Sequence, residues 1–141
     1  MKHYLQEIDV ETSRPIEFID VTDRVRAVVA SSGIVNGLVS VFSNHTTSAV
    51  KINECCLRLQ KDMETMLRET VPHDRPYLHN KETVDGRGNA HSHLMSLLIG
   101  SSETLPLMEG QLRLGTWQSI FFIELDGPRS ERSVTVTVVG E

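Results

Sequence analysis

The sequence predicts an α+β fold in which antiparallel sheets pack against two or three helices. Strand patterns are interleaved with helical patterns along most of the chain, and the last forty residues or so show strand patterns only. The length of 141 residues suits one domain with a sizeable core. The chain has no internal repeat and no low-complexity linker, so we expect one domain over residues 1–141.

The first forty residues predict two extended regions around a short helix. Residues 3–21 form one or two extended segments, which break near Pro15. A helix is then expected to start at Thr22, and a Ser-Ser-Gly sequence ends it. Its apolar stripe consists of Val25, Val28 and Val29. Residues 37–43 are rich in Val and Phe, which is typical of a buried strand, and that strand leads to His45.

The strongest helical pattern follows Asn53, which we expect to be the N-cap residue, and Pro72 ends it. Its apolar positions recur at three- and four-residue spacing; they are Cys56, Leu59, Met63, Met66 and Leu67. Residues 73–88 are polar and rich in turn residues, and a loop of this length is often functional. A short helix is expected from Asn89 to Gly100, with an inner face of Leu94, Leu97 and Leu98.

The C-terminal part predicts a hairpin turn at Gly110, a long strand over 117–125 and a last strand over 132–139. In the long strand, alternation puts Gln118 and Glu124 on one face with two apolar residues. A carboxylate is costly to bury unpaired, so Glu124 needs a cation or a metal, unless it lies at an edge in water.

Composition narrows the classes of function. The 14 basic and 19 acidic residues give a net charge of −5 without any basic run, so we expect no nucleic-acid partner. No apolar stretch reaches the roughly 20 residues that span a bilayer, and the N-terminus does not look like a secretory signal. The adjacent Cys55 and Cys56 are expected to be reduced thiols. A cytoplasmic protein that does not bind membranes is the expectation.

Four of the six histidines fall in polar, turn-like contexts. Because imidazole binds metal ions and carries protons near neutral pH, these histidines indicate a metal-binding or proton-transfer site. They are His45, His79, His91 and His93. For any one of them, a hydrogen-bonded, partly buried ring is the competing interpretation. On a helix, His91 and His93 lie about 200° apart and cannot share an ion. We therefore expect His93 to enter the site, because it adjoins the leucine positions.

Several sequence blocks together resemble the YjbQ-like family. They stand in family order from about residue 33 to residue 141, and G-T-W-Q and H-T-T-S-A are the most distinctive. The blocks include H-T-T-S-A-V-K-I-N-E (45–54), Y-L-H-N (77–80), S-H-L (92–94), G-S-S (100–102), G-T-W-Q (115–118) and D-G-P-R (126–129). The resemblance implies an α+β fold and a homotrimer.

The resemblance also implies a pocket at a subunit boundary that holds a divalent metal, with zinc expected because imidazole suits zinc better than magnesium. The matching metal ligands are His45, His79 and His93. Glu54 or Glu124 would act as the proton carrier. The substrate would meet Thr46, Asn53, Gln118 and Arg129.

Members of this family resemble secondary thiamine-phosphate synthases, which join a pyrimidine diphosphate to a thiazole phosphate and release pyrophosphate. Loss of pyrophosphate usually requires several basic residues and a carboxylate-held ion, so the residues support this activity only weakly. Three alternatives remain open. They are a zinc-dependent hydrolase, a non-catalytic module that binds a phosphorylated or anionic metabolite, and a structural trimer with an interface metal.

Overall fold

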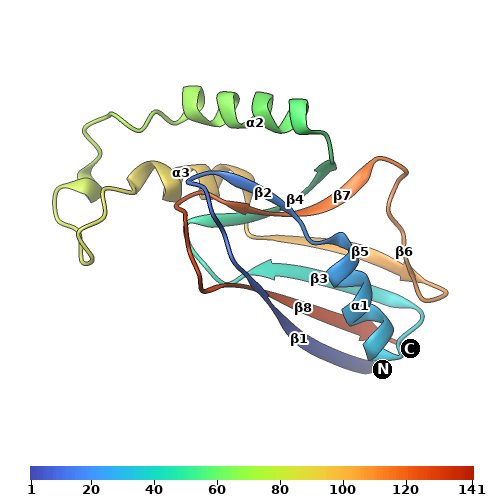
Figure 1. Cartoon of the computed structure of the whole chain (residues 1–141). Helices are drawn as coiled ribbons and strands as arrows, with labels where there is room; N and C mark the ends of the chain where they lie inside the picture. Colours follow the sequence, from blue (N-terminus) through green and yellow to red (C-terminus); the bar gives the residue numbers. More distant parts are fainter.

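The computed structural model describes residues 1–141 and confirms the α+β class, with two antiparallel sheets and three α-helices (Figure 1). The larger sheet has the order β1 (Lys2–Val10), β8 (Arg132–Gly140), β3 (Gly37–Ser43), β5 (Ser102–Met108) and β6 (Gln111–Leu112). The smaller sheet has the order β2 (Glu17–Asp20), β7 (Gln118–Glu124) and β4 (Ser48–Glu54). The expected C-terminal strands, including the long strand β7, are therefore present.

The main core lies between the two sheets, and a second core lies on the other face of the smaller sheet. The central strand β7 serves both, since Ile120 and Phe122 belong to the first and Phe121 and Ile123 to the second. Helix α1 (Thr22–Ser32) belongs to the first core through the predicted valine stripe. Helices α2 (Leu57–Thr70) and α3 (Ala90–Ile99) cover the second core (Figure 1).

The start of α2 differs from the prediction. Asn53 does not cap the helix, because β4 continues its pairing with β7 as far as Glu54 opposite Gln118. The N-cap position is Cys56, and the helix begins at Leu57. The strand β4 was not anticipated from the sequence. Backbone pairing with a central strand thus outweighs the local preference of Asn for a cap.

The inner face predicted for α3 was wrong. Leu97 and Leu98 are 78% and 62% exposed, whereas Ser92 and Met95 are buried. Two serine hydroxyls attach the helix to strand ends, since Ser92 Oγ donates to the Leu125 carbonyl at 2.6 Å and Ser96 Oγ donates to the Ser48 carbonyl at 2.7 Å. These bonds turn the serine side toward the sheet and the leucines outward.

The long polar loop of 73–89 is present and contains one 3₁₀ turn, η1 (Leu78–Asn80). It lies at the same end of the molecule as the start of α3 and the loop after β3 (Figure 1). None of the helices is both long and apolar enough to cross a membrane.

Candidate functional site

A polar hollow of about 430 Å³ lies where the 44–47 segment, the long loop and α3 meet. Its lining includes His45, Thr46, His79, Asn89, His93 and Arg129. A wider hollow of about 670 Å³ opens on the other side of His45, Thr46 and His93, with Phe42 and Leu97 in its wall. His45 and His93 therefore line both spaces and His79 lines the smaller one, while His91 lines neither of them.

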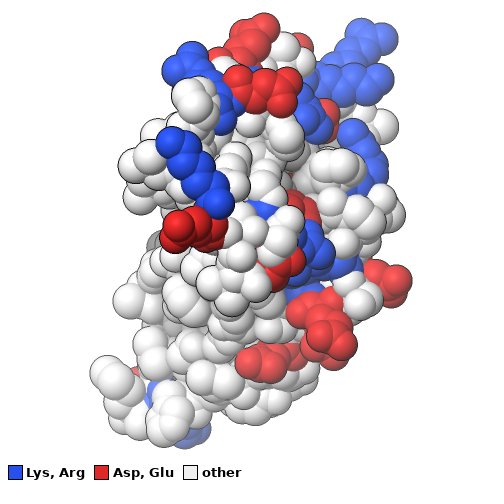
Figure 2. Space-filling view, turned by 90° about the vertical axis from the view of Figure 1, so that its left-hand side faces the viewer, with Lys and Arg blue, Asp and Glu red and all other residues white.

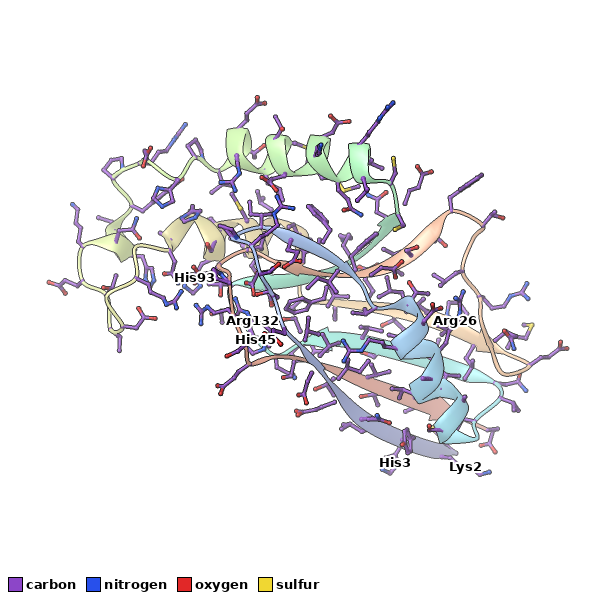
Figure 3. All side chains as sticks on the ribbon, in the orientation of Figure 1. Lys2, His3, Arg26, His45, His93 and Arg132 are labelled. Carbon is purple, nitrogen blue, oxygen red and sulfur yellow. The ribbon has the colours of Figure 1, made fainter.

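His45 is fixed by the first residues of β8. Its Nε2 accepts the backbone N–H of Ser133 at 2.8 Å, so in the neutral ring the proton resides on Nδ1. Burial lowers the pKa of His45, and the nearby Arg132 and Arg129 lower it further against an opposing effect of Glu124. The ring is thus a neutral hydrogen-bond donor at neutral pH. Figure 3 shows His45 beside Arg132, with His93 close by.

His79 and His93 touch edge to face, with ring centroids 4.8 Å apart and planes at 79°. His79 Nε2 lies 3.2 Å from Asn89 Oδ1, which can only accept, so Nε2 carries the proton and Nδ1 keeps a free lone pair. The Asn89 amide is itself oriented by its Nδ2, which donates to Asp126 Oδ2 at 2.8 Å. A histidine held through one nitrogen with the other left free is the usual preparation for a metal ligand.

A buried ion pair lies behind His45. Arg132 donates to both Glu124 oxygens, through Nε at 2.8 Å and through Nη2, and Nη2 also reaches Thr47 Oγ1 at 2.8 Å. Thr12 Oγ1 and the backbone N–H groups of Leu125 and Asp126 donate to the same carboxylate. Burial alone would raise the pKa of Glu124, but these hydrogen bonds hold it below its ordinary value. Glu124 is therefore a buried, ionised anchor.

Arg129 lies at the edge of the hollow and is bound to Asp126. Its Nη2 donates to Asp126 Oδ2 at 2.8 Å, and its Nε donates to the Asp126 carbonyl at 3.0 Å. Arg87 lies 3.6 Å from the other oxygen of the same carboxylate. Asp126 thus connects both arginines with the Asn89 amide. Both charge signs are interspersed over this end of the molecule (Figure 2).

The structure brings together only some of the residues expected at the site. His45, Thr46, His79, His93 and Arg129 line the hollow. Asn53, Glu54 and Gln118 do not, because they lie at the opposite end of β4 and β7, about 20 Å along the strand from Ser48 at 3.3 Å per residue. Glu124 is 0% exposed and faces Arg132 instead of the hollow. Neither expected proton carrier reaches the histidines within one chain.

Sequence reasoning missed Asn89 as the partner of His79, Asp126 as the partner of Asn89, and Arg132 as the partner of Glu124. In the sequence Asn89 stood out only as the start of the expected helix, and at that position it makes no side-chain cap hydrogen bond. The need of Glu124 for a cation was the one available signal for Arg132. No group of three His, Cys, Asp or Glu side chains in the chain is arranged to hold a metal ion. Among the three histidines expected as ligands, His79 and His93 are the two whose rings touch.

Fold and site define a class of small α+β proteins with a histidine-lined polar hollow at one end of a two-sheet core. Residues 6–141 match the family model described as UPF0047 protein YjbQ-like, and the chain belongs to this family. A UPF0047 protein of Methanothermobacter thermautotrophicus is 52% identical over 141 residues, which cover 100% of this chain and 95% of the relative. YugU of Bacillus subtilis is 33% identical over 137 residues, covering 96% of this chain and 99% of the relative.

Solved structures agree with this assignment. A YbjQ-like protein of unknown function from Sulfolobus solfataricus has a TM-score of 0.94 and 43% identity, covering 99% of both chains. A hypothetical protein from Aeropyrum pernix has a TM-score of 0.90 and 40% identity, covering 98% of this chain and 99% of the other. The family and fold expected from the sequence blocks are thereby confirmed.

Proposed function

We propose that the hollow is the active site of a metal-assisted enzyme that acts on a small phosphorylated or anionic substrate. The observation that carries the proposal is the chain of hydrogen bonds from Asp126 through Asn89 to His79, which leaves His79 Nδ1 free beside His93. Imidazoles on one tetrahedral ion have centroids about 5 Å apart, given a Zn–N bond of roughly 2 Å, and the two rings lie 4.8 Å apart.

His79 and His93 would hold the ion, with zinc the expected metal. When bound, such an ion polarises an oxygen or lowers the pKa of a bound water. His45, which the family resemblance places in the ligand set, has its Nε2 engaged by Ser133. We therefore assign His45 the role of a hydrogen-bond donor to a substrate oxygen through Nδ1–H, with Thr46 beside it and Arg129 at the edge.

Thiamine-phosphate synthesis is the activity we would assay first, and an unspecified zinc-dependent hydrolysis is the next. The support for the former is family resemblance together with Arg129 in the lining of the hollow. In this reaction a pyrimidine diphosphate loses pyrophosphate as the thiazole phosphate forms the new bond. His45 and Arg129 would bind phosphate oxygens, since both present N–H donors.

A non-catalytic binding protein is the second candidate. It is favoured by the position of Glu54 and Glu124, because neither carboxylate reaches the hollow to move a proton. Under this hypothesis the same histidines bind an anionic metabolite and no substrate is turned over at any metal loading.

We also propose a homotrimer, following the family resemblance. The outward leucines of α3 support an interface, because Leu97 and Leu98 are exposed and Leu97 lies in the wall of the wider hollow. A neighbouring chain there would cover the open side of the histidines.

The test is the zinc content of the purified protein and of single variants, measured by elemental analysis. We expect near-stoichiometric zinc in wild type and in His3→Ala, whose histidine lies at the far end of the molecule (Figure 3). After dialysis that removes weakly bound ions, His79→Ala and His93→Ala should lose it, and His45→Ala should keep it. Absence of zinc from wild type, even after zinc is supplied, would refute the metal site and favour the binding protein.

The catalytic part is tested separately with pyrimidine diphosphate and thiazole phosphate, by measuring pyrophosphate release. Zinc-loaded wild type should release it, and His45→Ala should retain zinc but lose most of the rate, roughly 100-fold or more as for a missing hydrogen-bond donor to the charge that develops in the reaction. Zinc binding without turnover of these or of hydrolysable phosphate esters would leave the non-catalytic hypothesis as the better one.

A further inference from the structure

Two histidines outside the hollow lie against each other where the long loop begins and where α3 begins. The rings of His73 and His91 have centroids 4.3 Å apart and planes tilted by 58°. His91 Nδ1 is buried and has no hydrogen-bond partner. Leaving such an atom unsatisfied costs about 1–3 kcal/mol, so the arrangement requires an explanation.

The hydrogen bonds of the two rings indicate which nitrogens are free. Ser92 Oγ donates its only proton to the Leu125 carbonyl, so at its 3.4 Å contact with His91 Nε2 it accepts and Nε2 carries the ring proton. His73 Nδ1 lies 2.9 Å from the Asp74 carboxylate and donates to it. The free lone pairs are therefore those of His91 Nδ1 and His73 Nε2.

We propose that His73 and His91 form a second metal site, distinct from the hollow, which takes one Zn²⁺ or similar transition-metal ion through His73 Nε2 and His91 Nδ1. Imidazole is the protein ligand such ions accept readily. A shared tetrahedral ion places two ring centroids about 5 Å apart, so the rings need to separate by less than about 1 Å. His73 can supply this movement because its side chain is 62% exposed.

The surroundings favour a cation at this place. The negative charges of the Asp126 and Asp74 carboxylates act on the His91 ring and favour a cation beside it, whereas the positive charge of Arg68 opposes one. Asp74 also orients the His73 ring by accepting a hydrogen bond from its Nδ1, as carboxylates do for the histidine ligands of many zinc sites.

An ion shared by these rings would join the start of the loop to the first turn of α3. The same loop carries His79 and Asp85, which line the hollow, and α3 carries His93. Binding would therefore restrain the wall of the hollow without occupying it. Two protein ligands leave open positions for water, so we expect weaker affinity than at a complete structural zinc site.

The test uses Zn²⁺ alone, titrated by calorimetry into the double variant His79→Ala/His93→Ala, which lacks the ligands proposed for the hollow. This variant should still bind one Zn²⁺ per chain. Adding His73→Ala should weaken that binding at least about 10-fold, the smaller loss known even for outer-shell partners. Adding His3→Ala instead is the matched control and should change nothing.

Nitrogen NMR of the histidine rings identifies the atoms. On addition of Zn²⁺ to the double variant, the signals of His73 Nε2 and His91 Nδ1 should shift, while those of His3 stay in place. No binding to the double variant, or binding that survives His73→Ala, would overturn the proposal. A failure of the metal site proposed in the hollow would not overturn this second site, because the double variant measures only binding at His73 and His91.

Discussion

Replacing Arg132 by methionine is expected to lower the free energy of unfolding by about 3–5 kcal/mol, because it leaves a buried carboxylate without its cation. Glu124 is 0% exposed and Arg132 is 5% exposed. The carboxylate receives five hydrogen bonds, two from Arg132 and one each from Thr12, Leu125 and Asp126. The variant keeps the last three, which are too few to replace the lost charge.

Urea unfolding followed by circular dichroism measures this change, at one fixed protein concentration because assembly would otherwise alter the midpoint. The double variant Arg132→Met/Glu124→Gln should be more stable than Arg132→Met alone, since it buries no charge. A cost of less than about 1 kcal/mol for Arg132→Met would contradict the reasoning. So would a double variant no more stable than the single one.

The pH dependence gives an independent check. The pKa of folded Glu124 is lowered, so its contribution to stability is present above the unfolded pKa and is lost as the pH falls through the folded value. In Arg132→Met, burial dominates and the folded carboxyl favours its protonated form. The stability difference between wild type and variant should therefore narrow as the pH drops to about 4, near the ordinary value for Glu.

Three further predictions follow from the site. Asn89→Leu should weaken Zn²⁺ binding in the hollow by about 10–100-fold in calorimetry, and unchanged affinity would exclude the role given to Asn89. In an NMR titration the His45 ring should gain its proton at a lower pH than an ordinary histidine, because burial and then Arg132 lower its pKa. The stability that the neutral ring contributes is therefore lost as the pH falls. A midpoint at the ordinary pH of a histidine would contradict this prediction. Leu97→Glu should convert trimers to monomers in light scattering while changing monomer stability by less than about 0.5 kcal/mol, and a monomeric wild type would refute the trimer.

The strands and helices that follow a clear period could be predicted from the sequence, and the inner face of α3 could not. The valine stripe of α1 and the two-sided burial of β7 rest on local patterns. Helix α3 has leucines that suggest an inner face, yet hydroxyls of Ser92 and Ser96 bind strand-end carbonyls and turn the leucines outward. Such long-range bonds leave no periodic signal.

Only part of the site could be predicted, because contacts between distant segments leave no local pattern in the sequence. Helical phase correctly separated His93 from His91, because a helix fixes the angle between neighbouring residues. The pairing of His73 with His91, and of Glu124 with Arg132, depends on how distant segments meet. Family blocks mark residues without saying where they lie, so Glu54 was expected at the histidines although it stands at the far end of β4.

The charges around the hollow determine whether it can bind a diphosphate without a metal ion. Arg129 and Arg87 both face Asp126, and Arg132 is bound to Glu124, so each nearby arginine already has a carboxylate partner. A diphosphate would meet few free cations, whereas its transfer requires its charge to be stabilised. The ion proposed on His79 and His93 would supply that charge.

Metal and diphosphate should therefore bind cooperatively, and by reciprocity each should tighten the other by the same factor. Calorimetry with inorganic pyrophosphate should show binding to zinc-loaded wild type and none to the metal-free protein. The triple variant His73→Ala/His79→Ala/His93→Ala serves as the control, because it lacks ligands of both proposed sites and any signal left there reports zinc pyrophosphate formed in solution. Equal pyrophosphate affinity with and without zinc would instead mean that His45 and Arg129 suffice, which favours the metal-independent binding protein.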